Sequence, residues 1–134
     1  MPRISQLYFR TAVIFLIIGI LMGLNMAISQ DHSVIGAHAH CNLLGWATMA
    51  IFGGYHALNP QKAEKRLAMI QYYVYTAGIA LMVPALYLML QGNTAMEPIV
   101  ALASVITFVG VLLFAFIIFS SEKVVLTPPA PSYR

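Results

Sequence analysis

Long apolar stretches alternate with short polar ones along the chain, and this alternation predicts its secondary structure. Four apolar runs lie at about 11–29, 37–57, 68–91 and 98–120. Each is close to the roughly 20 residues that a helix needs to cross the hydrocarbon core of a bilayer. No segment shows the period-two alternation of a half-buried strand. Because a lipid-exposed segment must satisfy its backbone hydrogen bonds internally, we expect four transmembrane helices.

The connections between the four runs are short, which favours one all-α domain, 1–134, whose neighbouring helices run up and down. The proline-rich segment 121–134 is expected to form a short tail. Small residues recur four positions apart in the first run, at Gly19 and Gly23, and in the second, at Ala50 and Gly54. Such pairs let transmembrane helices approach closely, so we expect tight packing at both.

Composition and the placement of charged residues indicate an integral membrane protein and its orientation in the membrane. The chain is 60% hydrophobic and 8% charged, which excludes an ordinary soluble domain. Basic residues occur before the first run, between the second and third, and after the fourth: Arg3, Arg10, Lys62, Lys65, Arg66, Lys123 and Arg134. The other two connections carry Asp31 and Glu97 and no Lys or Arg. The positive-inside rule then predicts an integral protein of a bacterial-type inner (plasma) membrane with both termini cytoplasmic.

Few groups within the apolar runs can carry chemistry. The runs contain no Asp, Glu, Lys or Arg, so an ion transporter or a hydrolase with an acid-oriented histidine is not expected. The single cysteine, Cys41, excludes an intrachain disulfide. No basic stripe with interleaved aromatic residues is present, so nucleic acid is not an expected partner. The lipid bilayer is the expected environment, and histidine is the main candidate for ligand binding.

Two histidines two residues apart, in the segment HAHCNLLGW, are the strongest candidates. Successive residues of an α-helix are rotated by about 100°, so His38 and His40 point to nearly opposite sides of the second helix. The two therefore cannot easily hold one metal ion together. One interpretation is that each only hydrogen-bonds to a neighbouring helix or loop. The other is that they bind haem, because neutral imidazole is a common axial ligand of haem iron.

The two faces of the second helix differ in character. The face of His40 is apolar, and some of its side chains are small, so a flat macrocycle could lie on it. The other residues of this face are Leu44, Ala47 and Ile51. The face of His38 is more polar and contains Asn42, Gly45, Met49 and His56. The small residue Gly45 could leave room for a ring on that side. His32, in an outer loop, is expected to be a solvated loop histidine, and His56, near the inner end of the helix, is expected to have a structural role at the membrane interface.

Copper is the alternative cofactor. Possible soft and imidazole ligands occur toward the outer side of the first two helices: Met22, Met26, His32, His38, His40, Cys41 and Met49. Methionine is also a frequent packing residue in apolar helices. The sequence contains no Met-x-x-Met or Cys-x-x-Cys pair that would place two copper ligands close together. A third interpretation is a cofactor-free structural or assembly subunit of a respiratory complex.

The segment HAHCNLLGWATMAIFGGYHALNP, residues 38–60, resembles the second transmembrane helix of the haem–copper oxidase catalytic subunit (subunit I), especially its nitric oxide reductase-like branch. A His-x-Asn-Leu-Leu run, a Trp, a Phe-Gly pair and a Tyr occur there in similar order. The residues that carry the match are His40, Asn42, Leu43, Leu44, Trp46, Phe52, Gly53 and Tyr55. The family's low-spin haem histidine falls on His40.

The resemblance implies a b-type cytochrome that transfers electrons, with a quinol or a respiratory-chain protein as its redox partner. The predicted haem-binding residues are His38, His40, Asn42, Leu44, Gly45, Trp46 and Ala47, of which His38 and His40 are the predicted iron ligands. Only the low-spin haem half of the family's site is implied. Four helices are far fewer than the catalytic subunit has, and no second helix supplies histidines for a copper site, so a complete oxidase or reductase is not expected.

The large members of the family have a pseudo-threefold plan of three four-helix arcs, and this chain corresponds to one arc. The resemblance therefore implies a homotrimer of identical chains. Each haem would lie between neighbouring chains, with His40 of one and His38 of the next as axial ligands. A twofold dimer with one haem between paired His40 residues is the alternative.

Overall fold

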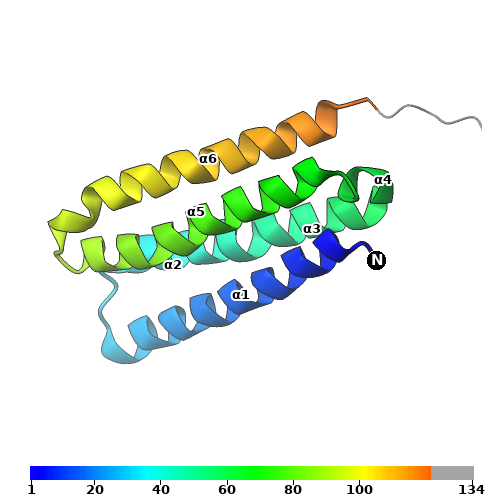
Figure 1. Ribbon diagram of the computed structural model, residues 1–134. Coiled ribbons are helices and arrows are strands. Elements are labelled where there is room, and N and C mark those ends of the chain that lie inside the picture. The colour runs from blue at the N-terminus through cyan, green and yellow to red at the C-terminus, as the bar shows by residue number, and fades with distance from the viewer. Residues whose placement is uncertain (122–134) are drawn as a thin grey trace, which may run out of the picture.

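The computed structural model describes residues 1–121, and this part of the chain contains helices and no strand (Figure 1). The all-α class expected from the sequence is confirmed. The three longest helices are α1 (Arg3–Ser29), α5 (Arg66–Leu90) and α6 (Glu97–Phe119). All three are long and apolar enough to cross a membrane, α6 together with the turn that precedes it. Of the predicted tail, 122–134 lies outside the described residues.

A fourth helical rod is made of three segments that follow one another without a break. They are α2 (Ile35–His40), η1 (Cys41–Thr48) and α3 (Met49–Leu58). The backbone stays right-handed helical at both junctions. We call this rod the central helix; at 1.5 Å per residue it is about 36 Å long. Its η1 segment is a π-helix, a wider helix that is rare and often found at functional sites, and it begins directly after His40.

The four rods lie side by side in the order α6, α5, central helix, α1 (Figure 1). The N-terminus and the short helix α4 (Pro60–Ala63) lie at one end, which we call the basic end. The connection 30–34 and the stretch 91–96, which contains the short helix η2 (Thr94–Met96), lie at the other, which we call the loop end. Gly92 has a φ of 102° in this second connection, a conformation that glycine adopts without steric cost.

Aromatic rings fill the core of the basic half. Phe52 of the central helix stacks on Phe114 of α6, with ring centroids 3.9 Å apart. The Tyr8 ring meets the edges of Phe52 and Tyr72, with centroids 5.7 and 5.0 Å apart. α1 begins at Arg3 rather than near residue 11, because Tyr8 and its neighbours before the apolar run are buried in this core. An apolar run therefore marks a possible membrane span and not the full length of a helix.

Hydrogen bonds between helices are concentrated in the same half. The Tyr8 hydroxyl donates to Gln71 Oε1, and Gln71 Nε2 donates to the carbonyl of Gly110, 3.2 Å away. This pair of bonds connects α1, α5 and α6. Lys62 Nζ donates to the carbonyl of Ile118 and to the hydroxyl of Tyr55, at 2.8 and 3.0 Å. Because lipid offers no hydrogen-bond partner, such interior bonds satisfy groups that would otherwise be costly to bury.

Glycines allow close helix contact at several points. A Cβ added to Gly110 would lie 2.9 Å from the Tyr75 Cα, so α5 and α6 touch at backbone level there. Gly19 and Gly23 of α1 face the side chains of Asn42 and His38, which confirms the close packing predicted at this pair. Gly54 has no atom within 4 Å of its Cβ position, so the same prediction is wrong at that residue.

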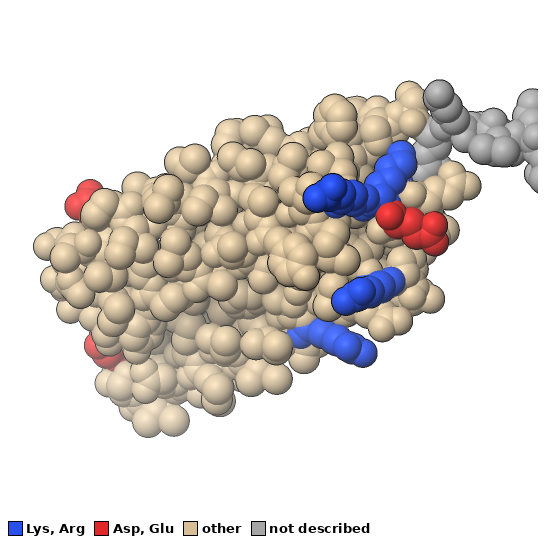
Figure 2. All heavy atoms as spheres, in the orientation of Figure 1, with Lys and Arg blue, Asp and Glu red and all other residues tan. Residues whose placement is uncertain are grey.

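The two ends of the bundle differ in charge (Figure 2). Among the described residues, Lys and Arg lie at the basic end, on the N-terminal part of α1 and around α4. The described connections at the loop end contain no Lys or Arg. The acidic residues at this end are Asp31, in the connection 30–34, and Glu97, the first residue of α6. The Ser33 backbone N–H donates to Asp31 Oδ1 at 2.9 Å and lowers the pKa of that carboxyl, so Asp31 is negative at neutral pH.

Candidate functional site

His38 and His40 lie on α2, in the loop-end part of the central helix. The structure places them in different surroundings. His38 is half-buried between α2 and α1, whereas His40 is exposed. His32 is exposed in the connection before α2, with Nδ1 3.2 Å from the Gln30 carbonyl. The single chain therefore does not gather the three imidazoles into one site.

The His38 imidazole is held by α1. Its Nδ1 lies 2.9 Å from the carbonyl oxygen of Gly19, and its Cε1 would lie 3.1 Å from a Cβ on Gly23. Asn42 Nδ2 donates to the His38 carbonyl at 3.0 Å and lies 3.3 Å from Nδ1. Since the carbonyl of Gly19 can only accept, its bond requires the proton on Nδ1. Nε2 of the neutral ring then carries the lone pair.

The His40 imidazole has the same tautomer for a different reason. Its Nδ1 lies 2.8 Å from the carbonyl of Gly36, one turn earlier on α2, so Nδ1–H donates there. No described residue makes a hydrogen bond with Nε2. Metal-bound histidines usually donate their other ring N–H to a carbonyl or carboxylate, which fixes the ring and the tautomer. The His40 side chain therefore fits the ligand position of an imidazole-bound iron.

The surface around His40 is apolar and uncovered in the single chain. Leu43 and Ile51 of the same helix are 64% and 66% exposed. The predicted haem neighbours Leu44 and Ala47 are half-buried beside them. We call this surface, residues 40, 43, 44, 47 and 51, the His40 face. It is a surface on which a flat apolar molecule could lie with an imidazole at one end.

The predicted haem neighbours on the other side are covered by the chain itself. Asn42 packs against α1 at Gly19, and a Cβ added to Gly45 would lie 2.6 Å from Cγ of Phe15. The Phe15 side chain thus fills the space that Gly45 was expected to leave for a ring. Trp46 is half-buried and packs against the aromatic core. Within one chain, only the His40 side of the central helix is open to a macrocycle.

His56 has surroundings that its place in the sequence did not indicate. It was expected near the membrane interface, but its side chain is 0% exposed. Its ring stacks on Tyr8, with centroids 5.9 Å apart, and meets the edges of Tyr55 and Phe114. Neither ring nitrogen has a hydrogen-bond partner. The aromatic rings leave His56 no open side for a cofactor.

A copper site has less support within one chain. Among the described residues, no three His, Cys, Asp or Glu side chains gather where they could hold one metal ion. Cys41 is fully buried, and its thiol donates to the carbonyl of Phe15 at 3.2 Å. The His and Cys residues among the possible copper ligands are therefore not gathered into one site by the described part of a single chain.

The chain matches no family model, no curated protein and no solved structure. The resemblance of residues 38–60 to a helix of the haem–copper oxidases therefore stays a prediction.

Proposed function

We propose that this chain is an integral membrane b-type cytochrome that binds haem through His40. The observation that carries the proposal is the His40 imidazole itself. It is exposed on an apolar helix face, its Nδ1–H is held by the Gly36 carbonyl, and its Nε2 lone pair is left without a partner. The resemblance of the same segment to the low-spin haem helix of the haem–copper oxidases supports the same function.

The membrane arrangement proposed here has four spans with both termini in the cytoplasm. α1, α5 and α6 are long and apolar enough to cross a bilayer, and the central helix has about the length of a bilayer's hydrocarbon core. The gathering of Lys and Arg at the basic end supports a cytoplasmic position for that end, in a bacterial-type inner membrane. His38 and His40 then lie near the outer face.

Single cysteines test this topology in a Cys41→Ala background. An impermeant maleimide added outside intact cells is expected to label Ser33→Cys at the loop end and to spare Gln61→Cys at the basic end; both positions are exposed. Permeabilised cells provide the control, in which both positions should react. Labelling of Gln61→Cys alone in intact cells would reverse the topology.

The haem would be held at the His40 face. His40 would supply a nitrogen ligand to the iron, and the apolar residues around it, Leu43, Leu44 and Ala47, would shield the ring from water. A bound haem b supplies one-electron transfer between its ferric and ferrous iron. The role of the chain's own residues is to orient the ring, and in the neutral imidazole the Nδ1–H bond to the Gly36 carbonyl leaves the lone pair on Nε2.

A second imidazole ligand would come from another chain, because the His40 face contains no other histidine and His56 is enclosed. We favour a cyclic trimer with one haem between neighbouring chains, held by His40 of one and His38 of the next. Its heterologous contacts close into a ring. The free Nε2 of His38 supports this arrangement, whereas the half-burial of His38 against its own α1 supports the alternative, a dimer with paired His40 ligands.

Absorption spectra of the full-length protein with bound haem test the assignment. His40→Ala is expected to abolish the low-spin Soret and reduced α bands, whereas His32→Ala, at an exposed loop position, should leave them largely intact. Full spectra in both variants would contradict the proposal. Equal losses in both would favour an outer site that contains His32, such as one for copper.

Stoichiometry separates the two oligomers. We expect one haem per chain and a trimeric mass in detergent, with haem lost in His38→Ala. One haem per two chains, or full haem binding by His38→Ala, would exclude the trimer and leave the dimer with paired His40 ligands. In either oligomer His40 stays a ligand, so this measurement does not decide the haem assignment itself.

A further inference from the structure

The η1 segment of the central helix is a feature that the proposed haem site leaves unexplained. It is π-helical over eight residues, Cys41–Thr48, and begins directly after His40. π-helices have i→i+5 hydrogen bonds, are rare, and mostly occur as single turns, frequently at functional sites. A π-helix of this length therefore needs contacts that favour it over an α-helix.

One set of contacts comes from α1. The buried positions of the central helix recur here every four residues: Ala37, Cys41, Gly45 and Met49. In an α-helix a spacing of four drifts by about 40°, so three such steps would turn the buried stripe by about 120°. A π-helix has more residues per turn, so the stripe drifts less. The π-helix thus keeps Cys41 and Gly45 on one side, where both lie against Phe15 of α1.

A second set of contacts is made by two hydroxyl groups that donate to carbonyl oxygens of η1. The Tyr75 hydroxyl, from α5, donates to the Leu44 carbonyl at 3.1 Å. Thr48 Oγ1 donates to the Leu43 carbonyl at 2.8 Å, five residues earlier in the same helix. In an α-helix a threonine hydroxyl bonds to the carbonyl three or four residues earlier, so the Thr48 bond matches the π-helix instead. Each carbonyl has two lone pairs and can accept a hydroxyl in addition to a backbone N–H.

Tyr75 is held in place independently of the central helix backbone. Its side chain is 0% exposed, and its ring meets the edge of Phe52, with centroids 5.0 Å apart. Its Cα and Cβ lie against Gly110 of α6. Because Tyr75 is fixed in this way, a change of η1 to an α-helix would move the Leu44 carbonyl relative to the hydroxyl. The same change would turn the residues before η1 relative to those after it, since the two helix types rotate by different angles per residue.

We propose that Tyr75 is a positioning residue for the haem ligands. Its hydroxyl holds η1 in the π-helical form, and this form keeps His38 against α1 while His40 stays on the open face. Tyr75 is buried and acts through the Leu44 carbonyl, so it is not itself a ligand. The inference rests on the haem site proposed above. Haem binds the chain in which the two histidines are correctly turned, so a lower population of the π-helical form weakens binding in proportion.

The hydrogen bond is tested without haem, in the full-length protein in phosphatidylcholine nanodiscs. Leu44–Gly45 is the only Leu-Gly pair in the sequence. Leucine labelled with ¹³C at the carbonyl and glycine labelled with ¹⁵N therefore give one correlated NMR signal, from the Leu44 carbonyl. Tyr75→Phe should move this signal upfield, because the carbonyl loses a hydrogen bond while the ring keeps its packing. Tyr73→Phe is the matched control, an exposed tyrosine of the same helix, and should leave the signal in place.

Titration of the same variants with haemin tests the positioning role. Tyr75→Phe should weaken haem binding about three- to tenfold, the effect of losing one hydrogen bond. Thr48→Val removes the second hydroxyl and keeps a β-branched side chain, so it should weaken binding in the same direction. Tyr73→Phe should bind haem like the unsubstituted chain. All variants should elute with the unsubstituted chain in size exclusion, which separates the expected effect from a loss of folding.

Three results would overturn the inference. An unchanged Leu44 signal in Tyr75→Phe would show that the hydroxyl does not bind this carbonyl. A shifted signal with unchanged haem affinity would give Tyr75 a structural role alone. Absence of specific haem binding by the unsubstituted chain would remove the proposed function and with it the ligand that Tyr75 positions. The Leu44 signal is recorded without haem, so this last failure is distinguishable from the first.

Discussion

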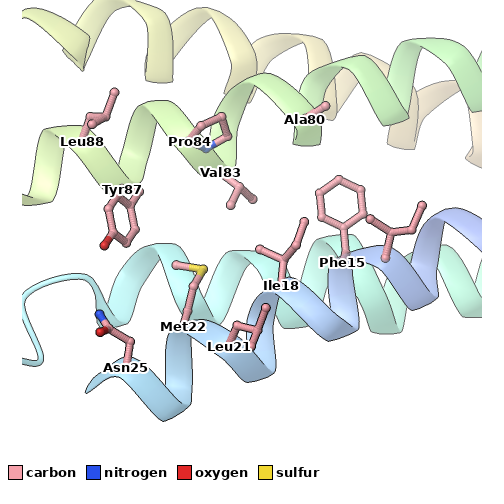
Figure 3. Close-up of a pocket in the computed structure, with 11 residues that line it drawn as sticks. Phe15, Ile18, Leu21, Met22, Asn25, Ala80, Val83, Pro84, Tyr87 and Leu88 are labelled. Atoms are coloured by element: carbon pink, nitrogen blue, oxygen red, sulfur yellow. The ribbon is translucent and has the colours of Figure 1, made fainter. Parts of the chain in front are cut away.

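At the basic end, hydrogen bonds through Tyr8, Gln71 and Gly110 join α1, α5 and α6, whereas at the loop end an open, mostly apolar groove lies between α1 and α5 (Figure 3). The basic half contains stacked aromatic rings and a buried lysine. The loop half contains His38 and His40, whose Nε2 atoms have no hydrogen-bond partner among the described residues. The basic half thus has the hydrogen bonds that join α1, α5 and α6, and the loop half has the imidazole nitrogens that are available to ligands.

The histidines of the central helix show the same contrast. His40 is exposed and its tautomer is fixed by a carbonyl, so Nε2 is directed to an outside partner. His56, on the same helix, is enclosed by Tyr8, Tyr55 and Phe114 and has no partner for either nitrogen. Residue type alone does not make a ligand. Burial and the bond to the second ring nitrogen decide what an imidazole can bind.

The largest expected stability effect tests the packing of the basic half. Gly110→Ala should destabilise the protein by about 1–3 kcal/mol, because the new Cβ would lie 2.9 Å from the Tyr75 Cα and the backbones must move apart. Gly54→Ala is the matched control, since nothing lies within 4 Å of its Cβ position. Thermal unfolding in detergent measures both. Equal melting temperatures would contradict the close α5–α6 contact.

A somewhat smaller effect is expected at the hydrogen-bonded network. Tyr8→Phe should destabilise by about 1–2 kcal/mol, because Gln71 Oε1 would stay buried without its donor. Tyr73→Phe removes the same group from a side chain that is 61% exposed, and it should be neutral. If thermal unfolding shows equal effects for the two variants, the bond to Gln71 does not contribute to the stability of the basic half.

Parts of the fold could be predicted because lipid-facing residues dominate the chain. The run expected at 68–91, for example, lies within one or two residues of α5, Arg66–Leu90. α1 extends further than its apolar run because the residues before Thr11 pack in the core, which a hydrophobic pattern cannot reveal. The π-helix after His40 has no counterpart in the pattern of apolar residues.

The candidate site could be predicted in part, for similar reasons. His38 and His40 are recognisable from residue type and spacing. That Gly19 accepts a hydrogen bond from His38, and that Phe15 fills the space beside Gly45, depends on which face of α1 meets the central helix. Local spacing contains no such information. The burial of His56 was missed for the same reason.

The smallest expected effect concerns His56. His56→Leu should stabilise the protein by about 0–1 kcal/mol, and so leave the melting temperature unchanged or raise it, because it removes two buried nitrogens that have no partner. It should also leave haem binding intact, in contrast to substitutions at His40. A marked loss of stability would show that a bound water or a polar partner satisfies the His56 ring.

Chemical rescue of His40→Gly tests the haem assignment most directly. Haemin is titrated into the full-length protein and the variant, each with and without free imidazole, and the Soret band is recorded. The account predicts a six-coordinate low-spin spectrum for the unsubstituted chain, its loss in His40→Gly, and its return when imidazole replaces the missing side chain. A low-spin spectrum in His40→Gly without imidazole, or no specific haem binding by the unsubstituted chain, would contradict the account.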